Sequence, residues 1–238
     1  MDNNAINICT LRFKEHLGLD QARLMRGAIV KIIGRENNVL FHNHIKTGLR
    51  YAYPLVQYKS IDDCAAIVGI GDAATKLQEL MPLFPCELRL GDKQTTFHVD
   101  NCQTVCYQPA FDIQPKLYSL NDYIALNERN IGRYHAMLAL TDKISFIEDI
   151  LTANILAFLK GIGYRAEEQI SCALTSMHEP REQNYKHVGF ACFNLQFVSN
   201  IELPDNIGLG KSSSIGFGNL KRLTLPRQFK DFKDRLPQ

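Results

Sequence analysis

Two histidines separated by a single residue, His42 and His44, are the first candidates for chemistry in this chain of 238 residues. We expect residues 38–44 to be extended, which points both imidazoles to one face because side chains repeat every two residues along a strand. Imidazoles titrate near neutral pH, so the pair suits a general acid and a general base. The groups that follow them, which could stabilise charge, are Lys46, Arg50, Tyr51 and Tyr53.

Phosphodiester cleavage in RNA would suit such a pair, because RNA supplies its own nucleophile in the 2′-hydroxyl and the reaction needs no metal or other cofactor. Two other interpretations stay open. His-x-His is also a metal-ligand spacing, although no Asp, Glu, Cys or further His lies within ten residues downstream of His44. The histidines could also be structural, as we expect for the five isolated ones, His16, His98, His135, His178 and His187.

A glycine-rich stretch near the C-terminus, NIGLGKSSSIGFG at residues 206–218, contains the Gly-Lys-Ser that ends a phosphate-binding P-loop. The spacing excludes a P-loop, because the residue five positions before Gly210 is Asp205 and not glycine. Fewer than thirty residues follow, too few for the parallel sheet of a nucleotide-hydrolysing domain. The stretch is therefore either a loop that holds phosphate or a hairpin connection in which the glycines only make turns.

Charge is distributed unevenly, although the formal net charge is only +2. Residues 12–50 carry eight Lys or Arg against three acids, and residues 209–238 carry seven against two. The stretch at residues 60–130 reverses this, with five against ten. Two basic segments that fold onto one face would bind a polyanion, whereas a merely solvated surface would show the same pattern without binding one.

Length and composition predict a two-domain protein that is soluble and cytoplasmic. No apolar run approaches the length of a membrane span, so we expect no membrane partner, and the polar start MDNN is unlike a secretory signal. The seven cysteines form no C-x-x-C pair. They fit a reducing compartment as small buried residues.

The first half of the chain reads as strand, helix, two strands, helix and strands. Alternation predicts a strand at residues 5–13, and 3.6-residue periodicity predicts a helix at residues 19–33 with Ala22, Met25, Ile29, Ile32 and Ile33 on one side. The remaining elements are strands at 38–44, 50–59, 86–90 and 95–107, and a helix at 73–80.

A similar order follows the stretch at residues 108–116, whose prolines predict a linker. We expect a strand at 134–140, a helix capped by Thr141 or Asp142 that ends before Gly161, and strands at 169–175, 185–198 and 220–225. Both halves suggest an α+β protein with tandem ferredoxin-like βαββαβ domains, in which helices cover one face of an antiparallel sheet. The expected domains are residues 1–112 and 113–238.

Several segments resemble the CRISPR repeat-processing endoribonucleases of the Cas-six type, in the expected order along most of the chain. The most specific is ELPDNIGLGKSSSIGFGNL at residues 202–220, which resembles the glycine-rich loop of that family. LFHNH followed by YAYPLVQYK is similar to the N-terminal block of one branch. ALNERN at residues 125–130 and NILAFLKGIG at residues 154–163 resemble middle segments.

The resemblance implies a metal-independent endoribonuclease that cleaves CRISPR repeat RNA by 2′-hydroxyl attack and leaves a 2′,3′-cyclic phosphate. By similarity, His42 and His44 match the paired catalytic histidines and Tyr51 matches an assisting tyrosine. The expected RNA contacts are Lys46, Arg50, Gly208, Gly210, Lys211, Ser212, Gly216, Lys221 and Arg222. A non-catalytic subunit that holds CRISPR RNA within a surveillance complex remains the alternative, and the resemblance also admits other CRISPR-associated proteins and a second copy of the chain as partners.

One departure concerns Ile215, because members of that family often carry an arginine just before the Gly-Phe-Gly of the loop. Isoleucine cannot make a bidentate phosphate contact. We therefore expect either a lower affinity for RNA or phosphate contacts supplied elsewhere, for example by Lys221 and Arg222.

Overall fold

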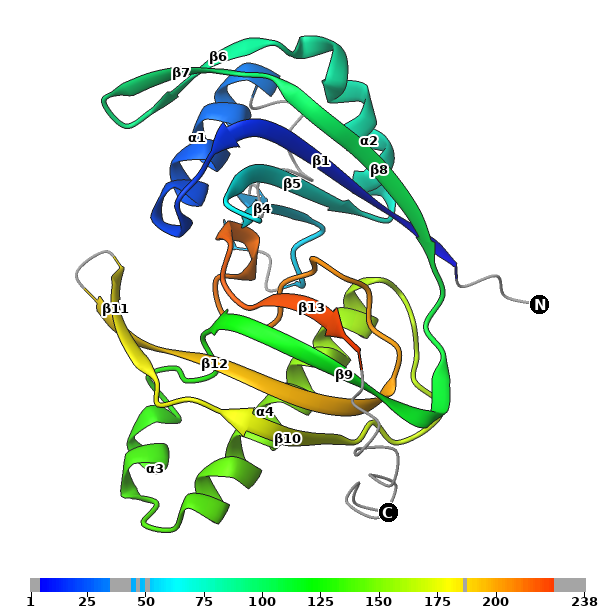
Figure 1. Cartoon of the computed structure of the whole chain (residues 1–238), viewed down its shortest axis with the longest axis vertical. Coiled ribbons are helices and arrows are strands. Elements are labelled where there is room, and N and C mark those ends of the chain that lie inside the picture. The colour runs from blue at the N-terminus through cyan, green and yellow to red at the C-terminus, as the bar shows by residue number, and fades with distance from the viewer. Residues whose placement is uncertain (1–4, 35–43, 46–47, 50–51, 186–187, 225–238) are drawn as a thin grey trace. The chain divides into compact units, whose positions relative to one another are not determined.

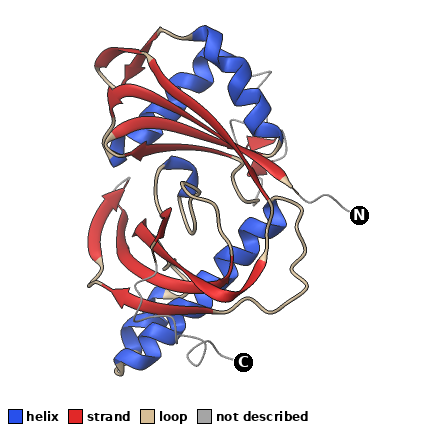
Figure 2. Cartoon of the chain, turned by 45° about the vertical axis from the view of Figure 1, so that its right-hand side comes forward, coloured by secondary structure: helices blue, strands red, loops and turns tan. Residues whose placement is uncertain are grey.

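The computed structural model describes residues 5–34, 44–45, 48–49, 52–185 and 188–224. The chain forms two compact units. Unit 1 comprises Met1–Gln108 together with Ser213–Gly216, and unit 2 comprises Pro109–Ser212 together with Phe217–Gln238. Figure 1 labels the elements of both units, and Figure 2 distinguishes their helices, strands and loops.

The main sheet of unit 1 has four antiparallel strands in the order β4-β5-β1-β8. Its strands are β1 (Ile6–His16), β4 (Val56–Ile61), β5 (Cys64–Ile70) and β8 (Val99–Tyr107). Its helices are α1 (Ala22–Ile33), preceded by the 3-10 turn η1 (Leu19–Gln21), and α2 (Asp72–Leu80), followed by η2 (Met81–Leu83). Two further hairpins pair β2 (His44–Ile45) with β3 (Gly48–Leu49) and β6 (Cys86–Leu90) with β7 (Lys93–Phe97).

Both helices of unit 1 pack on the same face of this sheet. The apolar side chains on that face of the strands and on one side of each helix form a common core. Cys9, Leu11 and Phe13 of β1 join Met25 of α1 and Leu77 of α2 in one hydrophobic core. The order of strands and helices is the βαββαβ plan, with its second and third strands at one side of the first strand and its fourth at the other.

Unit 2 repeats this strand order as β10-β12-β9-β13, with β11 paired to β12. Its strands are β9 (Phe111–Tyr123), β10 (Cys172–Met177), β11 (Arg181–Tyr185), β12 (Val188–Ile201) and β13 (Asn219–Leu223), and its helices are α3 (Ile131–Ala136) and α4 (Leu140–Gly161). Residues 202–218, all described, hold one 3-10 turn, η3 (Ser213–Ile215), where the plan would have its second helix. The predicted tandem ferredoxin-like fold is confirmed, with a loop in place of one helix.

Helix α4 and this loop pack on the same face of the unit 2 sheet. Tyr123 of β9 contacts both, since its hydroxyl accepts a hydrogen bond of 2.5 Å from Asn154 of α4 and its ring lies against Gly210 of the loop. Tyr118, on the same face, accepts a 2.8 Å hydrogen bond from the backbone N–H of Leu203 and stacks on Phe197 of β12. The loop is therefore part of the packed structure of unit 2.

Several sequence predictions of single elements are wrong. Residues 134–140 are not a strand, since α3 covers residues 131–136 and Leu138 is 99% exposed. Helix α4 begins at Leu140, before both predicted capping residues. The predicted linker contains the start of β9, and the predicted strand at residues 50–59 is β4, which begins at Val56. On α1, Ile32 is 42% exposed and does not join the buried side.

The cysteines and helices bear on the predicted class of protein. All seven cysteines are free; Cys9, Cys172 and Cys192 are buried, whereas Cys106 is exposed. Among the described residues, no helix combines the length and the apolar character needed to cross a membrane.

Candidate functional site

Of the predicted catalytic residues, only His44 lies in the described part of the chain. Its backbone forms the short strand β2, opposite Leu49 of β3. His42, Lys46, Arg50 and Tyr51 lie outside the described residues. Their roles and their geometry therefore stay predictions.

Downstream of this block, β4 carries polar side chains on the face turned away from the helices of unit 1. Val56 and Tyr58 belong to the hydrophobic core under α1, so the alternating Gln57 and Lys59 point to the opposite face. The Gln57 side-chain amide donates hydrogen bonds to the Tyr53 hydroxyl at 2.9 Å and to the carbonyl of Pro54 at 3.1 Å. This network ties residues 53–57 of the histidine-containing block to the sheet.

Lys59 is fully buried, and burial lowers its pKa from the ordinary value of 10.5 to about 7. Lys59 lies in the segment YAYPLVQYK, which gave it no predicted role, and the signal that marks it is a lysine inside the strand segment VQYKSI. A lysine with a pKa near 7 loses its proton easily around neutral pH.

This buried lysine predicts a pH-dependent stability. Below pH 7 Lys59 is charged in both the folded and the unfolded state, so the cost of burying the charge is fully present. As the pH rises from 7 towards 10.5, only the unfolded state keeps the proton, so the free energy of unfolding rises. The slope is about 1.4 kcal/mol per pH unit, which amounts to several kcal/mol over this range. We expect Lys59→Met to be more stable than the wild type at pH 6 and to lose this advantage by pH 10, measured by urea unfolding. Parallel stability curves for the two proteins would contradict the assignment.

The glycine-rich loop is organised by antiparallel pairing between its two arms. The backbone N–H of Asn206 donates to the carbonyl of Leu220 at 2.8 Å, and the N–H of Leu209 donates to the carbonyl of Gly218 at 2.9 Å. Gly208 forms a bridge to Asn219 between these bonds. The two arms of the loop are therefore paired as in a hairpin, which is one of the two structures that the glycine content predicted.

Two glycines of the loop are required by close packing in unit 2. Gly210 has a φ of +83°, and a Cβ there would lie 2.5 Å from a ring carbon of Tyr123. Gly218 has a φ of +63°, and its Cβ would collide with the carbonyl oxygen of Leu209. A larger residue at either position would combine a strained backbone with a steric clash.

The middle of the loop, Ser213–Gly216, belongs to unit 1 and packs against α1 and β4. Gly216 has a φ of +100°, and a Cβ there would lie 3.0 Å from the Leu19 side chain and 3.5 Å from the Tyr58 carbonyl. Ile215 is only 5% exposed. A buried isoleucine fits this packing role and makes no phosphate contact.

Among the predicted RNA contacts of the loop, the accessible ones are therefore residues 210–212. Gly208 and Gly216, both predicted RNA contacts, are buried, whereas Gly210 and Ser212 are partly exposed and Lys211 is exposed. The backbone N–H of Lys211 donates to the carbonyl of Ile124 at 3.1 Å. Its ammonium lies 4.5 Å from the ring centroid of Phe190 on β12, a cation–π arrangement that positions the charge.

Lys221 and Arg222, the predicted substitutes for the missing arginine, do not point in the same direction. They are successive residues of β13, so their side chains lie on opposite faces of the sheet. Arg222 faces the side of Tyr118 and forms a 2.6 Å ion pair with Glu202. The two cations therefore cannot bind one phosphate together.

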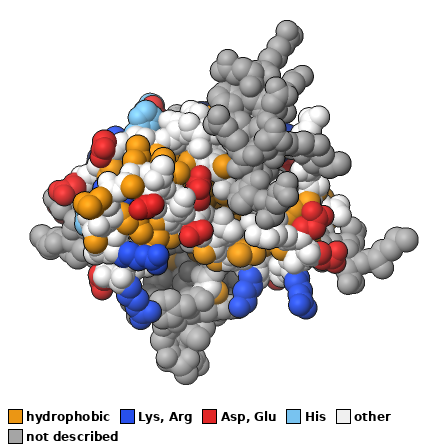
Figure 3. Space-filling model, turned by 90° about the horizontal axis from the view of Figure 1, so that it is seen from below, with side chains coloured by type: hydrophobic (Ala, Val, Ile, Leu, Met, Phe, Trp, Pro, Cys, Tyr) orange, Lys and Arg blue, Asp and Glu red, His pale blue; other side chains and the backbone are white. Residues whose placement is uncertain are grey.

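Figure 3 shows a face of the molecule in which hydrophobic and acidic side chains occupy the centre and most Lys and Arg side chains lie towards one edge. A polyanion track needs clustered cations, and the side chains that Figure 3 colours do not form one across the middle of this face. Among the described residues, no group of three or more His, Cys, Asp or Glu side chains is arranged to hold a metal ion.

Comparison with known proteins assigns the two units to one family. Residues 4–107 match the family model of the Cas6b N-terminal domain, and residues 111–223 match that of the Cas6b C-terminal domain. A curated relative, the uncharacterized protein MJ0978 of Methanocaldococcus jannaschii, is 34% identical over 104 residues, which are 44% of this chain and 69% of the relative.

Solved structures share the fold. A crystal structure of Cas6b has a TM-score of 0.84 at 24% identity, and a crystal structure of the CRISPR RNA processing endoribonuclease Cas6b has a TM-score of 0.70 at 22% identity. Each comparison covers 92% of this chain and 100% of the other. The two domain models together span nearly all of the described residues, and the chain therefore belongs to the Cas6b family.

Proposed function

We propose that this protein is an endoribonuclease that cleaves the repeat of CRISPR transcripts to mature CRISPR RNA. The observation that carries the proposal is the match of both Cas6b domain models, in order, over residues 4–107 and 111–223. It is supported by the fold shared with a structure described as a CRISPR RNA processing endoribonuclease.

The proposed reaction is a metal-independent transesterification within the RNA. The 2′-oxygen forms a bond to phosphorus while the bond from phosphorus to the 5′-oxygen breaks. A base removes the 2′-hydroxyl proton and an acid protonates the leaving oxygen, which yields a 2′,3′-cyclic phosphate and a 5′-hydroxyl. We assign His42 and His44 to these two proton transfers and Tyr51 to an assisting hydrogen bond, with Lys46 and Arg50 stabilising the phosphorane charge.

Within this proposal the glycine-rich loop binds the RNA backbone. Lys211 offers an exposed cation at the accessible segment 210–212, and Ser212 adjoins it with a hydroxyl that can donate to a phosphate. Gly210 is partly exposed, and because it has no side chain it can make the left-handed turn against Tyr123 that presents this segment. Gly208 and Gly216 are buried, so in the proposal they shape the loop and do not touch RNA.

The deciding experiment incubates the purified protein with repeat RNA in excess EDTA. We expect cleavage at one position, at the rate seen without chelator, and an upstream product that ends in a cyclic phosphate by mass spectrometry. Loss of cleavage in EDTA that zinc or manganese restores would favour the metal-dependent alternative. RNA that is bound but stays intact under both conditions would identify a binding subunit.

A further inference from the structure

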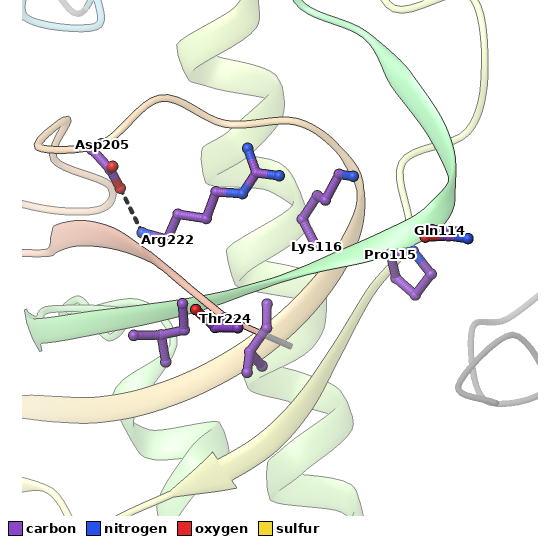
Figure 4. A pocket seen from close by; sticks show the side chains of 8 residues that line it. Gln114, Pro115, Lys116, Asp205, Arg222 and Thr224 are labelled. Carbon is purple, nitrogen blue, oxygen red and sulfur yellow. Dashed lines mark hydrogen bonds between the residues drawn. The ribbon is translucent and has the colours of Figure 1, made fainter. Parts of the chain in front are cut away.

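Unit 2 contains a pocket of about 510 Å³. It lies beside the N-terminal half of β9 and the C-terminal end of β13. Ligand pockets for small molecules span roughly 300–1,000 Å³, so one nucleotide fits. The polar residues at the pocket are Gln114, Lys116, Asp205, Arg222 and Thr224, and Pro115 is among its apolar ones. Figure 4 shows these residues from close by.

Two cations of this pocket extend from one face of the sheet. Arg222 of β13 is opposite Tyr118 of β9, and Lys116 lies two residues before Tyr118 on the same strand. Residues related in this way share a face and are diagonal neighbours within reach of long side chains. In Figure 4 the Lys116 and Arg222 side chains point to the same side of their strands.

The surrounding acids make the pocket a poor phosphate site. Lys116 is paired with Asp112 at 2.6 Å, and this hydrogen bond lowers the pKa of Asp112, which keeps the carboxylate charged at neutral pH. Arg222 is paired with Glu202 at 2.6 Å. Asp205 adds a third acid to these two pairs, so a phosphate would gain little net attraction.

Asp205 is fixed in place at the edge of β13 that pairs with the loop arm at residues 206–209. Its Oδ1 accepts a hydrogen bond of 2.5 Å from the backbone N–H of Arg222, drawn as the dashed line in Figure 4. The residue after it, Asn206, has a φ of +64° and is held by its own bond to Leu220. A carboxylate has about four lone-pair positions, so Asp205 retains capacity to accept further hydrogen bonds.

An uncharged ligand with both donors and acceptors fits this balance better than an anion. A nucleobase has this character, and guanine matches best among the four, because its N1–H and N2–H₂ groups donate and its O6 and N7 atoms accept. We propose that this pocket binds one unpaired guanine of the repeat RNA, with Asp205 accepting from its donors and Lys116 or Arg222 donating to its acceptors. This inference rests on the proposed function, because the guanine belongs to the RNA that the enzyme processes.

The test replaces each guanine of the repeat by inosine, one at a time, which removes only the N2 amino group. Affinity is measured on RNA with a 2′-deoxy scissile nucleotide, so that cleavage does not interfere. With wild-type protein we expect one inosine position to weaken binding about tenfold. Asp205→Asn should weaken binding of the unmodified RNA by a similar factor and abolish the effect of that one inosine, since Asn keeps the oxygen that accepts from Arg222 but lacks the carboxylate.

Asp149→Asn on α4 is the matched control, because it removes the same charge from an exposed position outside the pocket. It should bind like wild type and stay sensitive to the same inosine. The proposal would be overturned if Asp205→Asn and inosine lowered the RNA affinity additively at every inosine position. It would also be overturned if no inosine substitution changed the affinity of the wild-type protein. Tight binding of free guanosine monophosphate that Asp205→Asn abolishes would also overturn it, by making the pocket a nucleotide site. Failure of the proposed function is separate, because it shows as intact repeat RNA with wild-type protein.

Discussion

A single 2′-deoxy substitution at the scissile nucleotide is expected to reduce cleavage to background while the RNA still binds. The substitution removes the nucleophile of the proposed transesterification and leaves every other group of the substrate in place. One lost hydroxyl costs at most about 1.5 kcal/mol of hydrogen bonding, so the affinity should fall by about tenfold or less. Gel analysis of the same samples reports binding as a shifted band and cleavage as a shorter product.

The control for this substitution is a 2′-deoxy nucleotide placed one position upstream, which should be cut at close to the normal rate. Continued cleavage of the RNA with the deoxy scissile nucleotide would mean that water is the nucleophile. That outcome would reject the proposed mechanism and favour a metal-activated hydroxide, for which His42 and His44 could serve as ligands.

The fold was predicted correctly although two of its strands, β5 and β9, were not among the predicted elements. Local patterns were strong where one face of an element is buried. Helix α2, whose predicted span was residues 73–80, begins one residue earlier at Asp72, and β6 has the predicted bounds. Strand β5 was missed because almost all of it is buried, so CAAIVGI shows no alternation of apolar and polar residues.

Strand β9 was mistaken for a linker because prolines normally interrupt central strands. Its pairing with β12 is irregular between the Ser199–Lys116 and Ile201–Phe111 pairs, and Pro115 lies in this interval. A proline lacks the N–H that a regular ladder requires, so a bulge is where a central strand accepts one. Whether a central strand accepts a proline depends on the pairing with its partner strand, here β12. The sequence of residues 108–116 alone does not reveal this pairing.

The sequence indicates the candidate site residues by their type but not by their environment. The sequence pointed to the loop and to its cations, but the pairing of Arg222 with Glu202 and the burial of Gly216 arise from contacts between distant segments. The burial of Lys59 likewise depends on strand packing. Lys116 lies in no motif, Asp205 carries no assigned role within the loop segment at residues 202–220, and only the fold brings the two to one pocket.

His42→Ala and His44→Ala are each expected to slow single-turnover cleavage by about 10²-fold or more, because each removes one of the two proposed proton transfers. The double variant should be little slower than the worse single variant, since the two groups act on one transition state. The pH dependence gives an independent readout: a bell-shaped rate profile for the wild type should lose one limb in each single variant. RNA binding should change little, because the histidines act in the transition state.

His178→Ala is the matched control, because His178 is an exposed histidine that immediately follows β10 in unit 2 and has no assigned role in the reaction. It should cleave at the wild-type rate with an unchanged pH profile. Wild-type rates in both His42→Ala and His44→Ala would place the active site elsewhere in the chain. A loss of RNA binding in these variants, with a bell-shaped profile that persists in the remaining activity, would make the histidines contacts for the substrate and leave the acid and the base to other groups.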